Sequence, residues 1–313
     1  MMTHRHDDHS DHGHGMAEDL PRLNAQLGRR RALQWFAGAG TAALVAGCGG
    51  GSGSSSSSTT SSAAATTTTT TATPTPTATP TPTATATPTP TATTTGCVAD
   101  PSETAGPYPG DGTNTASGST SNVLTSSGIV RSDIRKSFIT STTDAGGVLV
   151  TLTLTVVNVN ATCAPLAGYA VYLWHADRQG HYSLYTAAAE SYLRGVQVTD
   201  ANGQVTFTTY FPPAYDGRWP HFHFEVFSSL SNALSGRYAI LTSQMCMPAA
   251  ICNTVFANTS LYPTAASIFS RLSLSTDNVF GDNTAAQIAQ QTPTFSGSVA
   301  AGYTAAAVIG IAR

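Results

Sequence analysis

Two histidines one residue apart, His221 and His223, are the residues best suited to chemistry in this chain. They alternate with Phe222 and Phe224, and successive side chains of a β-strand point to opposite faces of the sheet. Both imidazoles are therefore expected on one face and both phenyl rings on the other. Two neighbouring imidazoles on a rigid strand form a ready pair of transition-metal ligands.

Two tyrosines near the histidine pair indicate which metal it would hold. Tyr182 follows an expected strand end and turn, and Tyr215 lies in a proline-rich turn six residues before His221. A highly charged cation displaces the proton of a phenol, and the phenolate is a hard oxygen ligand that suits Fe(III). The candidate ligands of a ferric site are therefore the two tyrosines and the two histidines.

Other interpretations of the histidine pair stay open at this point. Glu225 would share the histidine face, so a site of two histidines and one carboxylate is conceivable, although ligands at positions i, i+2 and i+4 of one strand do not easily converge on one ion. Zinc or copper could also bind the pair. The other two histidines of this region, His175 and His181, are not expected to be metal ligands.

The elements expected to position these side chains are β-strands. Alternation of Val and Leu with Thr and Asn over residues 148–159 predicts a half-buried strand. Strands at this spacing, joined by turn residues, predict an all-β fold, an antiparallel β-sandwich, for a functional domain over residues 97–313. The other expected strands are 168–174, 204–210, 221–227 and 238–245, and the only expected helix is 265–272.

Three N-terminal segments are not expected to join this domain, and the second of them ends in a cysteine. Residues 1–28 are polar and rich in His and Asp, which predicts disorder. Residues 29–48 join Arg29-Arg30-Arg31 to a short apolar run, as in an export signal of the twin-arginine type. The run ends in Val45-Ala46-Gly47-Cys48, like a bacterial lipobox, in which Cys48 would be lipidated. A plain signal peptide with an incidental cysteine is the alternative.

Residues 49–96 form an expected tether, because they contain almost only Gly, Ser, Thr, Ala and Pro. At roughly 3.1 Å per residue in polyproline II form, such a tether could hold a domain on the order of 100 Å from its anchor. We therefore expect an exported, membrane-anchored lipoprotein, periplasmic or at the cell surface. Its membrane contact would be made only through the lipid anchor.

The charge balance of the chain does not favour a nucleic-acid partner. The chain has 14 Lys and Arg against 17 Asp and Glu, a formal net charge of −3. The expected domain has a single lysine, Lys136, and no basic stretch. Binding to nucleic acid normally needs a basic patch, so no such partner is expected.

Four cysteines follow Cys48, and an even number in an exported protein predicts two disulfides. A bond between Cys246 and Cys252 would close a short loop. A bond between Cys97 and Cys163 would fix the start of the domain to its first long strand. Four cysteines allow two other pairings. A cysteine metal site is not favoured, because no Cys-x-x-Cys spacing occurs.

Five sequence blocks together resemble the intradiol ring-cleavage dioxygenases, the family that contains catechol 1,2-dioxygenase and the β subunit of protocatechuate 3,4-dioxygenase. The blocks occur in the family's order, and the family's β-sandwich agrees with the expected strands. The blocks are Glu103–Tyr108, Arg131–Ile134, Trp174–Ser183, Pro212–His223 and Asp277–Phe280.

The resemblance implies roles for individual residues. Arg218 falls on an arginine that lies beside the substrate in the family and stabilises developing negative charge. Gln244 falls on a glutamine beyond the histidines and is expected to contact substrate. Tyr108 is expected to line the substrate pocket, with capping of the N-terminal loop as the alternative. The family's ligands of a non-haem Fe(III) cofactor fall on Tyr182, Tyr215, His221 and His223.

The resemblance also implies a reaction. A catechol-type substrate would lose its protons on binding, one of them to Tyr215 as general base, and O₂ would cleave the ring between the hydroxyl-bearing carbons. Both oxygen atoms would end in a muconate-type diacid, while Arg218 stabilises the charge that develops. A tethered, transthyretin-like binding module without turnover and a zinc or copper protein are the alternatives. The particular catechol and the oligomeric state are not predicted.

Overall fold

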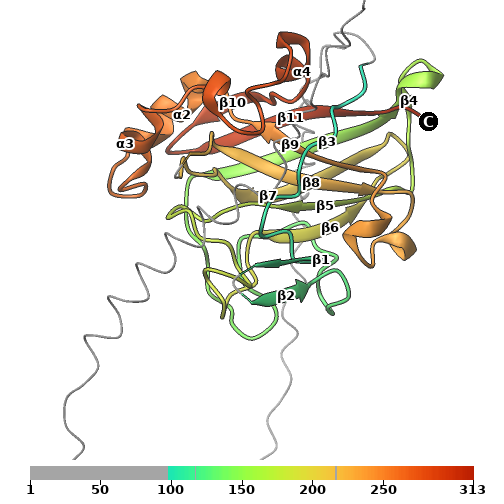
Figure 1. Cartoon of the computed structure of the whole chain (residues 1–313), viewed down its shortest axis with the longest axis horizontal. Coiled ribbons are helices and arrows are strands. Elements are labelled where there is room, and N and C mark those ends of the chain that lie inside the picture. Colours follow the sequence, from blue (N-terminus) through green and yellow to red (C-terminus); the bar gives the residue numbers. More distant parts are fainter. Residues whose placement is uncertain (1–97, 117, 216) are drawn as a thin grey trace, which may run out of the picture. The chain divides into compact units, whose positions relative to one another are not determined.

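The computed structural model describes residues 98–116, 118–215 and 217–313. The expected polar region, export signal and tether lie outside these described residues, as do Cys48 and Cys97. The helices that are described are all too short or too polar to cross a bilayer. Figure 1 shows the described part as layered β-sheets with short helices at one end.

The first sheet has five strands and is built around one long strand, β3 (Leu149–Asn158). The alternation that predicts this strand is confirmed, because every second residue from Val150 to Val156 is buried and the threonines between them are only half-buried. Its other strands are β10 (Thr294–Ser298), β11 (Gly302–Ile311), β4 (Ala164–Pro165) and β7 (Gln204–Tyr210).

One pairing in the first sheet departs from the expected antiparallel arrangement. β11 runs parallel to β3, in register from Tyr303 opposite Val150 to Ile311 opposite Asn158. The other pairings of this sheet are antiparallel. A parallel pair needs a long crossover connection, and here the chain between β3 and β11 forms most of the domain.

The second sheet has four antiparallel strands, and its inner face packs against the first sheet. Phe222, Phe224 and Val226 lie in one core cluster with residues of β3, and each such buried side chain contributes about 1.5–3 kcal/mol. The predicted alternation is confirmed, because His221 and His223 lie on the opposite face. The strands are β6 (Arg194–Val198), β5 (Ala170–Trp174), β8 (His221–Phe227) and β9 (Leu241–Cys246).

The outer face of the second sheet is also covered, and for this reason all seven residues of β8 are buried. Residues 98–110, here called the N-terminal segment, cross this face: the Glu103 amide donates to the Thr242 carbonyl over 2.8 Å. The segment leads into a hairpin of β1 (Asp111–Ala116) and β2 (Ser119–Asn122). This cover forms a second core cluster around Tyr172 and Trp174.

The described α-helices are short and follow β9 in the sequence. α3 (Ala265–Phe269) confirms the expected helix, but α2 (Ala249–Phe256) and α4 (Ala285–Gln290) were not expected. The start of α4 has a readable signal, a capping box between Thr284 and Gln287. Single-turn 3₁₀ helices occur at Val159–Ala161, Leu230–Asn232, Gly236–Tyr238 and Leu274–Thr276.

The predicted disulfide between Cys246 and Cys252 is wrong, because both residues are buried free thiols. Cys246 ends β9 with its Sγ 3.1 Å from Thr292 Oγ1, and Cys252 lies on the buried side of α2. Each packs as a small apolar side chain in the core. Cys163 does form a disulfide, and its predicted partner Cys97 lies outside the described residues.

Candidate metal centre and active site

The four candidate ligands meet on the outer face of the second sheet. The Nε2 atoms of His221 and His223 are 3.0 Å apart. Tyr182 Oη lies 3.1 Å from His223 Nε2 and 3.0 Å from Tyr215 Oη. Tyr215 Oη lies 3.3 Å from His221 Nε2, and Tyr182 Oη lies 3.5 Å from the same nitrogen. The structure thus brings together donor atoms from one strand and two separate loops.

Donor atoms at these distances fit a metal ion. Atoms about 3 Å apart at the corners of a tetrahedron lie about 2 Å from its centre, which is the length of a bond from a first-row metal to nitrogen or oxygen. Two phenol oxygens and two imidazoles form a donor set that suits Fe(III). Within the described part of the chain, His, Cys, Asp and Glu alone form no group of three that could hold a metal. A site here therefore needs the tyrosines.

Both histidines present a neutral Nε2 to the cluster. The Nδ1–H of His221 donates to the Trp219 carbonyl, which leaves the Nε2 lone pair free for a ligand. The ring of His223 stacks on Trp174 with centroids 4.9 Å apart and planes 9° apart. Burial lowers the pKa of His221 to about 3, with a further contribution from the charge of Arg218, and burial also lowers the pKa of His223. Neither imidazole carries a charge that would repel a cation.

The two tyrosines differ in their exposure. Tyr182 lies in the loop between β5 and β6 and is 2 % exposed, whereas Tyr215 lies in the loop between β7 and β8 and is only partly buried. Burial raises the pKa of both phenols, and the charge of Arg218 acts in the opposite direction on Tyr215. Ionisation of the pair therefore depends on a cation between them.

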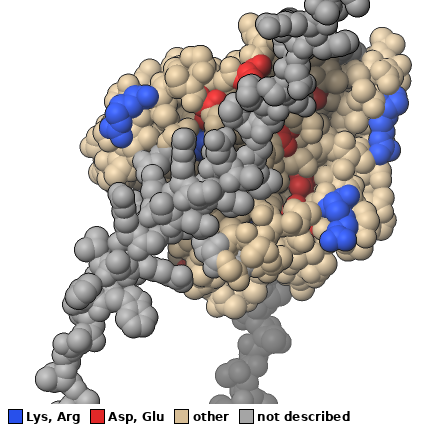
Figure 2. Space-filling view, in the orientation of Figure 1, with Lys and Arg blue, Asp and Glu red and all other residues tan. Residues whose placement is uncertain are grey.

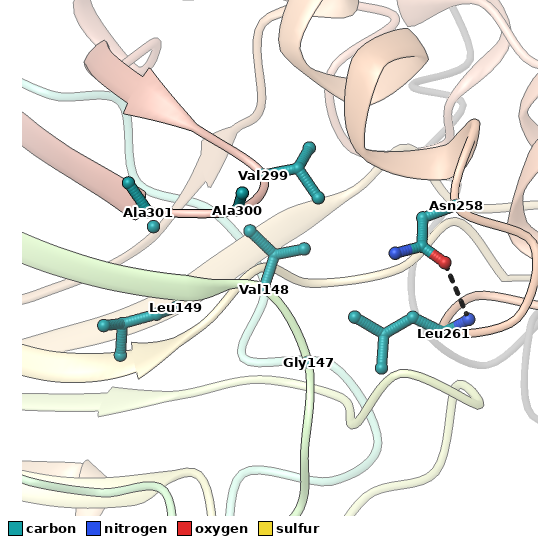
Figure 3. Close-up of a pocket in the computed structure, with 9 residues that line it drawn as sticks. Gly147, Val148, Leu149, Asn258, Leu261, Val299, Ala300 and Ala301 are labelled. Atoms are coloured by element: carbon teal, nitrogen blue, oxygen red, sulfur yellow. Dashed lines mark hydrogen bonds between the residues drawn. The ribbon is translucent and has the colours of Figure 1, made fainter.

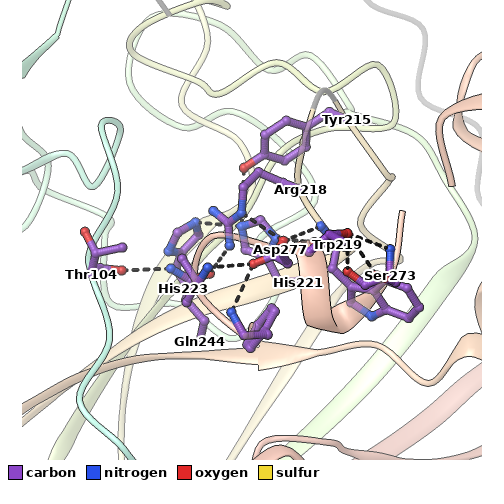
Figure 4. Close-up of polar contacts among 12 residues, drawn as sticks. Thr104, Tyr215, Arg218, Trp219, His221, His223, Gln244, Ser273 and Asp277 are labelled. Atoms are coloured by element: carbon purple, nitrogen blue, oxygen red, sulfur yellow. Dashed lines mark hydrogen bonds and ion pairs between the residues drawn. The ribbon is translucent and has the colours of Figure 1, made fainter. Parts of the chain in front are cut away.

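Arg218 is held beside Tyr215 by two polar side chains (Figure 4). Its Nε donates to Asp277 Oδ2 over 3.1 Å, and its Nη2 donates to Gln244 Oε1 over 2.7 Å. Gln244 is fully buried in β9 and donates through Nε2 to the Thr104 carbonyl over 2.8 Å. The guanidinium is thus fixed at the cluster, and Gln244 lies behind it as a support.

Asp277 supports the site, although the sequence alone predicts no individual role for it. Its Oδ2 accepts from the Trp219 amide over 2.6 Å, and its Oδ1 accepts from the amides of Val279 and Phe280. Burial raises the pKa of this carboxyl, but Arg218 and the Trp219 amide outweigh burial, so the pKa is lowered overall. An aspartate that accepts a hydrogen bond from the backbone amide two residues later is a local pattern that can be recognised in a sequence.

The N-terminal segment covers the cluster. Gly106 has a φ of 71°, and a Cβ at this position would lie 3.3 Å from Cε1 of His223. The ring of Tyr108 lies 5.1 Å from that of Tyr182 and 5.2 Å from that of Tyr185, measured between centroids. Tyr108 therefore lies beside the cluster, against the ring of Tyr182.

Three further polar residues of this region lie apart from the cluster. His175 is bonded through Nε2 to Thr209 Oγ1 over 2.7 Å and through Nδ1 to a neighbouring carbonyl. His181 lies in a loop with its side chain 43 % exposed. Burial and the nearby Asp111 raise the pKa of Glu225, which faces that aspartate. The structure therefore does not support a metal site made of the two histidines and Glu225.

A separate cavity of about 430 Å³ lies away from these side chains (Figure 3). It is lined by residues 147–149 and 299–302 with Asn258 and Leu261. None of these lining residues can titrate, so the cavity offers no catalytic group. Charged side chains are few and scattered on the face seen in Figure 2.

A family model described as Dioxygenase matches residues 129–222. The matched stretch includes Tyr182, Tyr215 and His221 and ends one residue before His223. No curated protein matches the chain.

Solved structures similar to this chain include three dioxygenases. An intradiol ring-cleavage dioxygenase from Tetranychus urticae is 24% identical with a TM-score of 0.52, over 69% of this chain and 95% of that chain. The dioxygenase domain of a fusion with a carbohydrate-binding protein from Streptomyces sp. SirexAA-E is 20% identical with a TM-score of 0.42, over 69% and 100%. Catechol 1,2-dioxygenase from Pseudomonas arvilla C-1 is 20% identical with a TM-score of 0.35, over 57% and 55%.

The Tetranychus urticae protein shares the fold described above. The family model covers the loops of Tyr182 and Tyr215 and the first two residues of β8. The resemblance of this chain to the intradiol ring-cleavage dioxygenases, which are enzymes, is therefore confirmed.

Proposed function

We propose that this protein is a non-haem Fe(III) dioxygenase that cleaves a catechol-type ring between its two hydroxyl-bearing carbons. Both atoms of O₂ would enter a muconate-type diacid. The observation that carries the proposal is the convergence of two phenol oxygens and two imidazole nitrogens, five of whose six pairs are 3.0–3.5 Å apart. The family resemblance supports ring cleavage of catechols in general, and the donor set supports the choice of metal.

Each residue of the site has a distinct task in this proposal. Tyr182 and the two histidines would hold the ion permanently, because they are almost completely buried. A bound ferric ion supplies the electron-accepting capacity that oxidative ring cleavage requires. Tyr215 is the more exposed phenol and is suited to accept a proton from a catechol hydroxyl as general base.

Arg218 is the cation of the site that faces substrate. It is fixed by Asp277 and Gln244, so its charge is in place before negative charge develops on the ring and on the new carboxylates. Arg218 and Tyr215 are partly exposed, as is Tyr108 at the wall of the site, so we expect substrate to enter where these side chains reach the surface. The N-terminal segment covers the cluster at Gly106, which is buried against the ring of His223.

Export and anchoring are part of the same proposal. We infer lipidation at Cys48 and display of the domain on the tether of residues 49–96, on the basis of the lipobox-like sequence and its composition. A Cys48→Ser variant is then expected to leave the membrane fraction and to keep the activity of its domain. Retention of that variant in the membrane would contradict the anchor.

Oxygen consumption tests the proposed reaction. Iron-loaded protein should take up one O₂ for each catechol-type ring opened and give a diacid product with both atoms labelled by ¹⁸O₂. Tyr185→Phe serves as a control, because Tyr185 neighbours the site without belonging to the donor cluster. A colourless protein that binds zinc or copper and consumes no O₂ with any catechol would overturn the proposal in favour of the binding-module or zinc and copper alternatives.

A further inference from the structure

Arg194 is a buried arginine behind the candidate metal centre, at the start of β6, and is 1 % exposed. A guanidinium has five N–H donors, and all five are used here. Nε donates to Ser183 Oγ over 2.9 Å, and Nη1 donates to the Pro109 carbonyl over 2.6 Å and to Tyr172 Oη over 2.9 Å. Nη2 donates to the Tyr108 carbonyl over 2.8 Å and to the Ser183 carbonyl over 2.9 Å.

These five bonds join three parts of the fold. One is the N-terminal segment, one is β5, and one is the loop that follows Tyr182. Two of the bonded residues bracket Tyr182, because Ser183 is its neighbour in the chain and the ring of Tyr108 packs 5.1 Å from its ring. The single guanidinium of Arg194 therefore holds both the backbone next to Tyr182, at Ser183, and the backbone of Tyr108, whose ring packs on Tyr182.

The backbone around Arg194 adopts conformations that bring these groups together. Leu184 follows Ser183 with a φ of 68°, and Leu193 precedes Arg194 with a φ of 56°. Bulky residues rarely occupy this left-handed region unless the surrounding contacts hold them there. Gly110 also has a positive φ, and a Cβ at this position would lie 2.9 Å from Arg194 Nη1.

The charge of Arg194 has only neutral acceptors around it. In the described part of the chain, no carboxylate lies within ion-pair distance of its guanidinium. A buried charge without a counterion is costly, and the planar fork of five donors offsets that cost only when all five find acceptors. Lysine, with three donors on one atom, cannot reproduce this arrangement.

We propose that Arg194 is a positioning residue for the metal centre, which clasps the N-terminal segment to the loop of Tyr182 and so sets the position of the Tyr182 oxygen relative to the histidines. Its role toward iron rests on the proposed function. The clasp itself is a property of the metal-free protein and can be tested there.

Amide hydrogen exchange of the metal-free full-length chain tests the clasp. In Arg194→Lys, the amides of residues 104–110 and 183–187 are expected to exchange roughly tenfold faster or more than in the wild type. Four of the five Arg194 bonds go to these two segments, and their loss makes local opening of the segments easier. Leu152→Ala, a core change in the first sheet, controls for a general loss of stability and should show no selective increase there. Unchanged exchange in Arg194→Lys would overturn the clasp.

A milder variant keeps the test decisive where Arg194→Lys fails to fold. Ser183→Ala removes the acceptor of Arg194 Nε and leaves the charge and the carbonyl contacts in place. We expect faster exchange in residues 183–187 and little change in residues 104–110. Equal exchange at both segments in this variant and the wild type would count against the clasp.

The iron-loaded protein tests the link to the metal centre. Arg194→Lys is expected to shift the visible tyrosinate-to-iron band and to lower kcat with little change in KM, because Arg194 touches a ligand loop and no substrate group. If only the charge of Arg194 mattered, Arg194→Lys would keep the wild-type band and kcat. That result would refute the proposed role of Arg194 in positioning Tyr182. A wild-type chain that binds no iron would instead overturn the proposed function, while the exchange experiment still decides on the clasp.

Discussion

Arg218 and Asp277, 59 residues apart in the sequence, form a buried ion pair in which Arg218 Nε donates to Asp277 Oδ2 over 3.1 Å. The same carboxylate oxygen accepts from the amide of Trp219, the residue that follows Arg218. Asp277 therefore fixes the backbone and the side chain of the turn before His221. This relationship links the cation of the candidate site to the strand that carries its histidines.

Asp277→Asn should weaken the site and the fold together. The change leaves Arg218, whose side chain is only 12 % exposed, without a countercharge, and the loss of one member of a buried pair costs about 3–5 kcal/mol. We expect a fall in thermal stability and a drop in kcat of roughly tenfold or more. Asp133→Asn is the matched control, because its pair with Arg135 is exposed and worth about 1 kcal/mol at most. Equal effects of the two changes would contradict this role of Asp277.

Tyr215→Phe should remove the proposed general base. We expect kcat to fall by about 10²-fold or more, since a positioned base contributes about 10²–10⁴-fold to such steps. Tyr185→Phe, which alters a neighbouring phenol outside the donor cluster, should change kcat little. Steady-state oxygen uptake on the same catechol measures both variants. Similar rates in the wild type and Tyr215→Phe would show that another group takes the proton.

Asp100 should make stability depend on pH. Burial raises its pKa from 3.8 to about 7, although the Gly310 amide and Gln290 donate to it. Between these values the folded chain keeps a proton that the unfolded chain has lost, so rising pH favours unfolding. The contribution of Asp100 to stability is full below pH about 4 and falls as pH rises toward 7, by at most about 4 kcal/mol. Urea unfolding of the wild type and of Asp100→Asn should show a difference that changes across this window, and a constant difference would refute it.

Thiol labelling should distinguish the cysteines. Cys246 and Cys252 are buried free thiols, so they should resist alkylation in the folded protein and react fully after denaturation without reductant. Cys163 should react only after reduction, because it is disulfide-bonded. Mass mapping of the alkylated peptides measures this, and protection of Cys246 and Cys252 in the denatured, unreduced chain would show that they are bonded.

The sequence predicted the donor cluster and five strands, β3, β5, β7, β8 and β9, because these depend on local patterns. The other described strands, β1, β2, β4, β6, β10 and β11, were not predicted. The alternation of His221 and His223 with phenylalanines settles which face of β8 each side chain occupies. The tyrosines were found by their position in turns near that strand. The parallel pairing of β11 with β3 was not predicted, because the Ala-rich β11 has no clear alternation and its pairing depends on the whole crossover.

The supporting residues were harder to predict for a related reason. Asp277 and Arg194 act through contacts with segments distant in the sequence, and a single charged residue in a loop or at a strand end does not reveal its partner. The short spacing of Cys246 and Cys252 suggested a bond that the core packing around β9 and α2 does not form. Local spacing predicts which residues can meet, and tertiary packing decides which of them do.

Titration of the metal-free protein with Fe(III) shows whether the two tyrosines and two histidines form a ferric centre. We expect one ion bound per chain and a visible tyrosinate-to-iron charge-transfer band that shifts or disappears in Tyr182→Phe and in Tyr215→Phe, while Tyr185→Phe keeps the wild-type band. Binding of iron without that band, or a band unchanged by both ligand variants, would contradict a centre built from Tyr182, Tyr215, His221 and His223.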